Sequence, residues 1–138
     1  MNFDKLRILQ ASLTVFNQKL QAYHWNLYGS HFFQWHKQLE KLIKQVRDYT
    51  DDVAEKIRMN GKFSISSLEK ALEISLIKEE KEDVSFDINH VSKSVVNDIE
   101  ILLKHIELVS WNFTEQPLID EVILGLDKAK WQFGVAIE

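Results

Sequence analysis

One proline and four glycines are spread over 138 residues, so very little in this chain interrupts a helix. In four stretches the apolar residues recur at alternating intervals of three and four, which is the spacing of one face of an amphipathic α-helix. No stretch alternates strictly between apolar and polar residues, as a half-buried strand would. These observations predict four long helices and an all-α fold.

The four predicted helices cover most of the chain. Their apolar faces consist, in chain order, of residues 6, 9, 13, 16, 20, 23 and 27; of 39, 42, 43, 46, 53 and 57; of 88, 91, 95, 99, 102, 106 and 109; and of 119, 122, 126, 129 and 133. Gly29 is expected to end the first helix, and Asn60-Gly61 the second. Thr114 is placed to cap the start of the fourth helix, and Pro117 falls in its first turn.

The connections between the predicted helices indicate their arrangement. The first connection, at Gly29, and the third, at residues 111–114, are short and therefore join antiparallel neighbours. The residues between Gly61 and Ser85 form a long connection, in which the segment SSLEKALEIS is expected to be a short helix capped by Ser66 or Ser67. Two hairpins joined by a long middle crossover predict a ferritin-like four-helix bundle, with residues 1–138 as one domain.

Composition excludes several classes of function. A net charge of −4, with 17 basic residues scattered among 21 acidic ones, disfavours binding to a nucleic-acid backbone. The absence of cysteine excludes disulfides, thiolate metal ligands and cysteine nucleophiles. No apolar run is long enough to span a membrane, and the start, MNFDKLRILQ, does not resemble a signal peptide. We therefore expect a cytoplasmic protein that does not bind membranes.

Several polar residues at the first helix–helix connection and along the second helix are candidate metal ligands. His24 lies near the end of the first helix and His36 near the start of the second. On a helical wheel of about 100° per residue, Glu40, Asp51 and Glu55 fall within roughly a quarter turn of His36. Imidazole and carboxylate ligands without thiolate suit iron, manganese or zinc. The alternative is that these are ordinary solvated residues on a helix rich in charge.

Distance prevents these residues from forming one site within a single chain. His36 and Asp51 are 15 residues apart, which is about 22 Å along a straight helix. Two copies of the helix that cross antiparallel near residues 45 and 46 would bring the histidine end of one copy opposite the carboxylate end of the other. The sequence thus predicts a dimer with two equivalent sites. Each site would contain His24, His36 and Glu40 from one subunit and Asp51 and Glu55 from its twofold partner.

Other residues with suitable side chains are assigned structural roles. The chain contains no Glu-x-x-His, the pair that di-iron sites within ordinary ferritin bundles use. The similar spacing at residues 87–90, Asp-x-x-His, is interpreted as a helix start with a surface histidine. His31 and His105 have no partner at ligand spacing. Trp25 and Trp35 are expected to pack, the alternative being that they take up stray oxidising equivalents beside an oxidising site.

The candidate ligands resemble the signature of the Dps family (DNA-binding protein from starved cells) of mini-ferritins. In that family a His-Trp pair closes the first helix, a second histidine follows twelve residues later, and an acidic residue comes four positions beyond it. The matching residues are HWNLYGSHFFQWH, which begins at His24, then Glu40, then DDVAEKI, which contains Asp51 and Glu55. SSLEKALE resembles the small crossover helix of the family, and LDKAKW, which ends at Trp131, resembles part of its last helix.

The resemblance implies a function as well as a fold. Dps proteins are tetrahedral shells of twelve subunits with ferroxidase sites at the dimer twofolds. They oxidise Fe(II), preferentially with hydrogen peroxide, and store ferric mineral inside. For this chain the resemblance implies a homo-dodecamer, Fe(II) and hydrogen peroxide as substrates, and the five candidate ligands as catalytic iron ligands, at which zinc or manganese could substitute. Glu40 departs from the family, which more often has aspartate at this position.

Two further comparisons with the family concern DNA and the entry of iron. Many DNA-binding members use a Lys/Arg-rich terminal tail, whereas this chain enters its first helix at once and ends at Ala-Ile-Glu, so no DNA binding is expected. The acidic threefold pores of the family suggest Glu115, Asp120 and Glu121 as pore residues, although Pro117 stands where a polar residue is expected. The competing interpretation is a non-enzymatic shell, or a DNA-coating protein, with weak or no ferroxidase activity.

Overall fold

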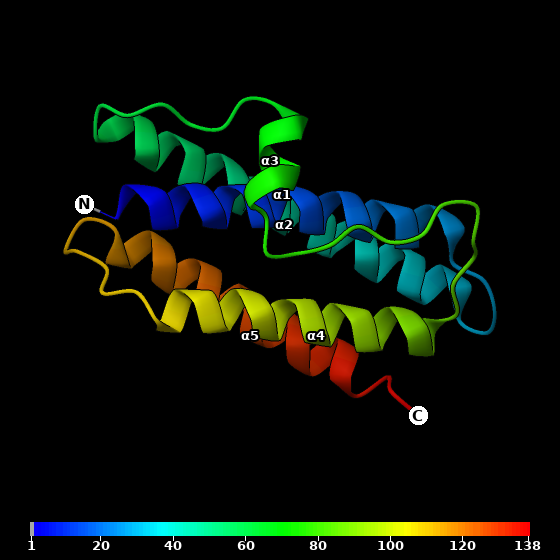
Figure 1. Cartoon of the computed structure of the whole chain (residues 1–138). Helices are drawn as coiled ribbons and strands as arrows, with labels where there is room; N and C mark the ends of the chain where they lie inside the picture. Colours follow the sequence, from blue (N-terminus) through cyan, green and yellow to red (C-terminus); the bar gives the residue numbers. More distant parts are fainter. Residues whose placement is uncertain (1) are drawn as a thin grey trace.

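The computed structural model describes residues 2–138, and this part of the chain is largely helical and contains no β-strand (Figure 1). Its helices are α1 (Phe3–Asn26), α2 (Phe32–Met59), α3 (Leu68–Ile74), α4 (Ile88–Glu107) and α5 (Gln116–Gly134). Between residues 2 and 138, none of these helices combines the length and the apolar character that crossing a membrane requires. The predicted all-α bundle, with a short extra helix in the long middle crossover, is confirmed.

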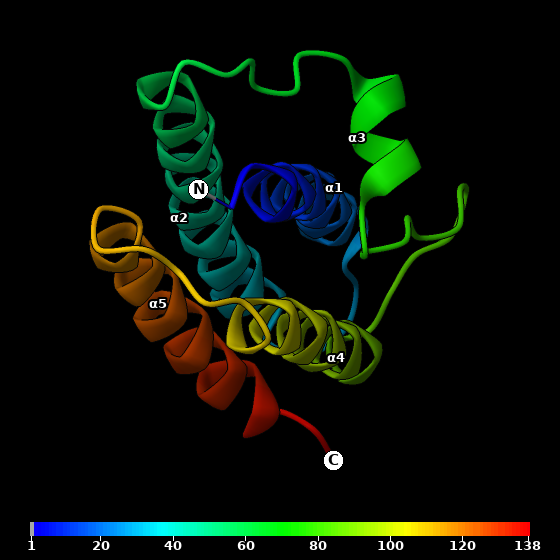
Figure 2. The same ribbon diagram turned by 60° about the vertical axis from the view of Figure 1, so that its left-hand side comes forward.

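The four long helices pack as two antiparallel hairpins, α1 with α2 and α4 with α5. Contacts of α1 with α4, and of α2 with α5, join the hairpins into one bundle. The crossover carries the chain back along the bundle, so that α2 and α4 run in the same direction (Figure 1). The short helix α3 lies outside the bundle against α1 (Figure 2).

The core of the bundle consists of the apolar faces predicted from the sequence. Every position of those faces is buried except Ile88, the first residue of α4, and Val109, two residues beyond its end, which are both half-buried. Each fully buried aliphatic or aromatic side chain contributes about 1.5–3 kcal/mol relative to an exposed one. The periodic apolar pattern therefore supplies most of the driving force for the fold.

Three of the helix ends follow the sequence prediction. Ser67 caps α3, since its Oγ accepts a hydrogen bond from Lys70 N at 3.1 Å. Asp87 caps α4 by accepting from His90 N at 2.8 Å, which confirms that residues 87–90 form a helix start. The second helix ends at Asn60, followed by Gly61 in the left-handed conformation at φ 77°.

Two other helix ends differ from the prediction. α1 ends at Asn26, three residues before Gly29, which adopts φ 105° in the following turn. The prediction that Thr114 caps α5 is wrong. Asn112 Oδ1 accepts hydrogen bonds from the backbone amides of Thr114 at 3.1 Å and Glu115 at 2.9 Å. The amide acceptor of Asn112 therefore organises this turn in place of the threonine hydroxyl.

The helices α2 and α5 approach each other closely at Gly125. A Cβ atom added to this glycine would overlap the hydroxyl group of Tyr49 on α2. Tyr49 is half-buried, and burial raises the pKa of its hydroxyl, assisted by the negative charges of Glu121 and Asp48. The absence of a side chain at Gly125 thus allows Tyr49 to lie across α5.

Candidate metal centre

His24, in the last turn of α1, and His36, near the start of α2, lie against each other. Their rings stack with centroids 3.8 Å apart and 14° between the ring planes, and Phe32 stacks against His36 at 5.1 Å. His36 Nδ1 lies 2.8 Å from the backbone carbonyl oxygen of His24. Because a carbonyl only accepts hydrogen bonds, Nδ1 carries the proton and Nε2 keeps its lone pair. His36 therefore presents a nitrogen suited to a metal ion.

His24 carries unused hydrogen-bonding capacity. Both of its ring nitrogens are buried, and neither has a hydrogen-bond partner among residues 2–138. Burial lowers the pKa of His24, the neighbouring His36 lowers it further, and the carboxylate of Glu40 acts in the opposite direction. The net effect favours a neutral imidazole, which is the form that binds metals. A coordinated ion would satisfy a nitrogen that the protein leaves without a partner.

Glu40 follows His36 by one helical turn and is exposed. Its Oε1 lies 3.9 Å from Lys44 Nζ, also on the surface of α2, at the outer limit of an ion pair. Such an exposed contact contributes at most about 1 kcal/mol, so the Glu40 carboxylate can leave it for a cation at low cost.

The carboxylates of Asp51 and Glu55 lie one turn apart on the C-terminal half of α2, together with Asp52. Oxygen atoms of these three residues lie within 4.8 Å of one another, and all three side chains are exposed. Partial desolvation raises the pKa of Asp52 although the side chain is exposed, and the charges of Asp51, Glu121 and Asp48 raise it further. The negative charge gathered here would be relieved by a cation.

Asp52 was missed in the sequence analysis, although the doublet Asp51-Asp52 was visible there. The helical wheel favoured Asp51 because Asp52 falls about 100° away from it, toward α5. In the structure Asp52 lines a shallow hollow with Glu55 and Glu121. The doublet itself was the signal, since adjacent carboxylates repel unless something compensates their charge.

Within one chain the histidine half and the carboxylate half of the predicted site remain apart. The helix α2 is continuous from Phe32 to Met59. The 15 residues from His36 to Asp51 therefore correspond to about 22 Å along the helix. The assignment of both halves to a single metal site stays a prediction that requires a second subunit.

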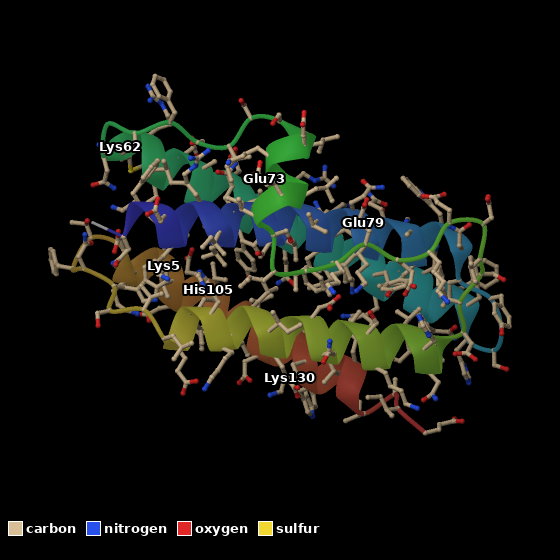
Figure 3. The ribbon with its side chains drawn as sticks, viewed as in Figure 1. Lys5, Lys62, Glu73, Glu79, His105 and Lys130 are labelled. Carbon is tan, nitrogen blue, oxygen red and sulfur yellow. The ribbon has the colours of Figure 1, made fainter. Side chains whose placement is uncertain are left out.

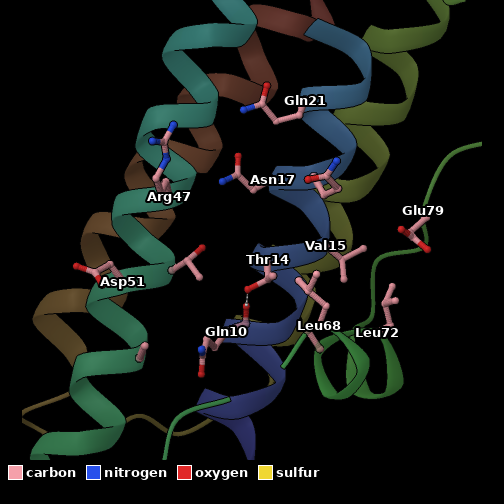
Figure 4. A pocket seen from close by; sticks show the side chains of 14 residues that line it. Gln10, Thr14, Val15, Asn17, Gln21, Arg47, Asp51, Leu68, Leu72 and Glu79 are labelled. Atoms are coloured by element: carbon pink, nitrogen blue, oxygen red, sulfur yellow. Dashed lines mark hydrogen bonds between the residues drawn. The ribbon is translucent and has the colours of Figure 1, made fainter. Parts of the chain in front are cut away.

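A groove of about 590 Å³ lies between α1, α2 and α3, near the middle of α2 (Figure 4). The residues labelled along it are Arg47 and Asp51 from α2, Gln10, Thr14, Val15, Asn17 and Gln21 from α1, Leu68 and Leu72 from α3, and Glu79 from the crossover. Leu68 and Leu72 remain 75% and 48% exposed. Exposed leucines beside a groove are typical of a surface that a partner covers.

Glu115 does not suit the pore role predicted for it. It is completely buried, and its carboxylate accepts hydrogen bonds from the backbone amide of Asn112 at 2.9 Å and from Asn2 Nδ2 at 2.8 Å. Burial alone would raise the pKa of Glu115, but these hydrogen bonds lower it. The carboxylate of Glu115 therefore stabilises the turn before α5. Asp120 and Glu121 are exposed and remain the candidates for a pore.

The other three histidines lie outside the candidate metal site. His105 Nε2 donates to the backbone carbonyl of Lys5 at 3.1 Å, and Figure 3 shows the two residues side by side. His90 Nε2 donates to Glu80 Oε2 at 2.9 Å. His31 immediately precedes α2 in the left-handed conformation. None of the three lies in the acidic cluster of α2 or in the stacked histidine pair.

The tryptophans that flank the histidines differ from each other. Trp35 packs against Phe133 of the core, with ring centroids 5.3 Å apart, as expected. Trp25 is 62% exposed, so the prediction that it packs within the chain is wrong. Its position at the end of α1 turns the indole ring outward instead.

Comparison with known proteins agrees with this geometry. Residues 4–122 match the family model of the ferritin-like domain. The DNA protection during starvation protein of Helicobacter pylori is 32% identical over 136 residues, which cover 94% of this chain and 93% of that one. The crystal structure of antigen TpF1 from Treponema pallidum superposes with a TM-score of 0.93 at 28% identity, covering 99% and 90% of the two chains. A Dps protein from Vibrio cholerae, described as a ferritin-like diiron-carboxylate protein, gives 0.89 at 25% identity, covering 99% and 88%.

Proposed function

The chain belongs to the Dps family of ferritin-like proteins, and from this premise we propose that it oxidises Fe(II) with hydrogen peroxide and stores the ferric product. The oxidation takes place at sites shared between two subunits. Storage takes place inside a cytoplasmic shell of twelve copies, each a single ferritin-like domain formed by residues 1–138. Through these two activities the protein protects the cell against oxidative damage.

The observation that carries this proposal is the symmetric placement of the two half-sites on α2. The midpoint of this helix, Phe32–Met59, falls between residues 45 and 46. His36 and Glu55 lie equally far from that midpoint, and so do Glu40 and Asp51. A twofold axis through the midpoint would pair these residues across two antiparallel copies of α2. The groove, which is lined by Arg47 beside the midpoint and by the exposed Leu68 and Leu72 of α3, would then face the partner.

The two halves supply complementary chemistry for iron. His24 and His36 offer neutral nitrogen ligands, and Asp51 and Glu55 offer anionic oxygen ligands. Carboxylates stabilise Fe(III) more than Fe(II), because the interaction grows with the charge of the ion. Two Fe(II) ions give up one electron each to one hydrogen peroxide, whose O–O bond breaks to form two water molecules with two protons. Because both electrons go to one peroxide, no hydroxyl radical is released.

The storage role needs a closed shell and a route for iron. Asp120 and Glu121, exposed near the start of α5, are the carboxylates we assign to an entry pore. Zinc or manganese would occupy the same ligands, because imidazole and carboxylate do not exclude these ions. The net charge of −4 disfavours binding to DNA.

The test is anaerobic loading with Fe(II) followed by hydrogen peroxide, with light scattering on the same sample. The parent should oxidise Fe(II) rapidly in a particle of about 200 kDa, twelve chains of 16.2 kDa each. His24→Ala/His36→Ala should keep the particle and lose the rapid phase. Equal rates in the two proteins would contradict the site. A shell without ferroxidase activity that retards DNA in a gel at low salt would instead support the alternative, a DNA-coating protein.

A further inference from the structure

The end of the crossover holds the connection that links the two histidine-bearing helices. Phe86 N donates to the backbone carbonyl of Asn26 at 2.9 Å, and Tyr28 N donates to the carbonyl of Phe86 at 2.9 Å. The same two segments form an isolated bridge between Leu27 and Phe86. Asn26 is the last residue of α1, so the crossover also satisfies a carbonyl at the end of this helix.

This contact bears on the histidine half of the site. His24 stands two residues before Asn26, and the connection that follows leads into α2 and to His36. The spacing of the two imidazoles therefore depends on the path of the connection. Because Phe86 is hydrogen-bonded to the backbone of this connection, contacts that hold Phe86 in place also hold the path of the connection.

A polar network anchors the crossover to the bundle through Glu80. Tyr23 Oη lies 2.7 Å from Glu80 Oε2 and 2.6 Å from Ser94 Oγ. Because a carboxylate cannot donate, the Tyr23 hydroxyl donates to Glu80 and accepts from Ser94. His90 Nε2 donates to the same oxygen, Oε2, at 2.9 Å. Glu80 thus links α1 to the first turn of α4.

The aromatic ring of Phe86 connects this network to the backbone contact. It packs edge-on against Tyr23, with centroids 5.0 Å apart and 84° between the planes, and stacks on His90 at 5.2 Å and 21°. Both rings that hold Phe86 are therefore hydrogen-bonded to the one carboxylate of Glu80.

Glu80 differs from its neighbours in the acidic stretch 79–83. Its side chain is 16% exposed, whereas the other residues of the stretch are exposed. Burial alone would raise the pKa of Glu80, but hydrogen bonds from His90, Tyr23 and the backbone amide of Lys81 lower it to about 2. The carboxylate therefore stays ionised and accepts from all three donors.

We propose that Glu80 is a positioning residue for the histidine half of the metal site, acting through Tyr23, His90 and Phe86 on the connection between α1 and α2. It does not touch the metal. Its carboxylate sets the relative placement of His24 and His36 before the partner subunit and iron arrive. This inference rests on the proposed function of the same site.

The test compares variants in the intact shell. Glu80→Ala removes the acceptor, and Tyr23→Phe removes one donor but keeps the ring against Phe86. Glu82→Ala removes an equal charge from an exposed position of the same stretch. Ile77→Ala loosens the crossover at a buried apolar contact instead. For each protein we would measure how the initial oxidation rate depends on Fe(II) and record the ligand-field spectrum of bound Co(II).

We expect Glu80→Ala and Tyr23→Phe to raise the Fe(II) concentration at half-maximal rate about tenfold, the low end of the effect of losing a direct outer-shell partner, because both act on the histidines indirectly. Their Co(II) spectra should differ from that of the parent. Glu82→Ala should match the parent in both measurements. Ile77→Ala should lower the melting temperature and leave the Co(II) spectrum unchanged. An equal spectral change in Ile77→Ala would overturn the proposal, because general loosening would then be sufficient.

The failure of this inference differs from the failure of the proposed function. If the parent does not oxidise Fe(II), or if His24→Ala oxidises it as fast as the parent, the function itself is wrong. If His24→Ala is slow while Glu80→Ala and Tyr23→Phe behave as the parent does, only the positioning role is wrong. Should Glu80→Ala not assemble, Tyr23→Phe decides the outcome, because it removes a single oxygen atom.

Discussion

The two ends of α2 hold their polar side chains in opposite ways. At the N-terminal end His36 is stacked on His24 and hydrogen-bonded to its carbonyl, so one subunit already fixes the orientation of the ring. At the C-terminal end Asp51, Asp52 and Glu55 are exposed, and their charges repel. The histidine half is thus preorganised within a chain, whereas the carboxylate half needs a partner or an ion to compensate its charge.

The sharpest test of this comparison is complementation between two inactive proteins. His24→Ala/His36→Ala and Asp51→Asn/Glu55→Gln should each lower the oxidation rate at least about 100-fold, because removing metal ligands lowers activity more than removing the outer-shell partners of those ligands does. In randomly mixed shells about half of the dimers contain both variants, and each such dimer has one intact site. We therefore expect about a quarter of the parental activity in purified mixed shells.

The control for complementation is a mixture assembled from shells of each variant that are combined only after assembly. This mixture should stay inactive, because its dimers do not exchange partners during a short assay. No recovery in truly mixed shells would show that the two halves do not combine across the dimer, and the difference between the two ends of α2 would then have no bearing on iron oxidation.

The second test concerns the carboxylate that supports the histidine end. The pKa of Glu80 is lowered to about 2 from 4.5, so its contribution to stability is present above pH 4.5 and is lost as the pH falls toward 2. The full shift corresponds to about 3 kcal/mol. Glu80→Gln should therefore flatten the loss of stability between pH 5 and pH 2.5 in urea unfolding followed by circular dichroism. Glu82→Gln should follow the parent curve.

The third test disturbs α2 near its carboxylate end. Gly125→Ala introduces a Cβ that overlaps the hydroxyl of Tyr49, and overpacking of this kind costs about 1–3 kcal/mol. Gly134→Ala is the matched control on the same helix, because a Cβ there meets only Val96 Cγ2 at an ordinary 3.9 Å. The free energy of unfolding should fall for the first variant and change by less than about 0.5 kcal/mol for the second. Equal stability of the two would mean that the Tyr49 side chain moves aside at little cost.

The smallest expected effect comes from the repulsion among the carboxylates. The raised pKa of Asp52 means that its charge opposes folding at neutral pH, so stability is gained as the pH falls through the raised value. Asp52→Asn should raise the stability of the metal-free protein at pH 7 by about 0.2–0.5 kcal/mol, the size of a like-charge pair on a helix. Calorimetry at low ionic strength measures this gain, and added salt should reduce it. A loss of stability would mean that Asp52 is favourably paired.

Much of the fold followed from periodicity, because an apolar face that repeats over several turns is the mark of a helix packed against a core. The contact between His24 and His36 could be predicted for a related reason, since a short connection brings the last turn of one helix against the first turns of the next. The packing of Trp35 could be expected on the same grounds. These features depend on residues that are close in sequence or repeat regularly.

The features that the sequence did not reveal depend on residues far apart in the chain. Glu80 is hydrogen-bonded to Tyr23, which is 57 positions away in the sequence. No local sequence pattern predicts which acidic residue of the stretch 79–83 points toward the bundle. Glu115 was assigned to a pore from the acidic threefold pores of the family that the chain resembles, yet Asn112 and Asn2 donate hydrogen bonds to its carboxylate in the structure. The conformation of a long crossover or a tight turn is set by tertiary contacts, and single-residue preferences do not specify these.

The continuity of α2 has a consequence for how such a chain can diverge. In the proposed dimer every residue added or removed between Glu40 and Asp51 would shift one half-site by about 1.5 Å and turn it by about 100° relative to the other. Both sites of the dimer would suffer together. Side chains of this interval that do not face the partner helix can therefore vary, while its length stays constant, so that the number of residues between the two acids is a more durable mark of descent than their identities.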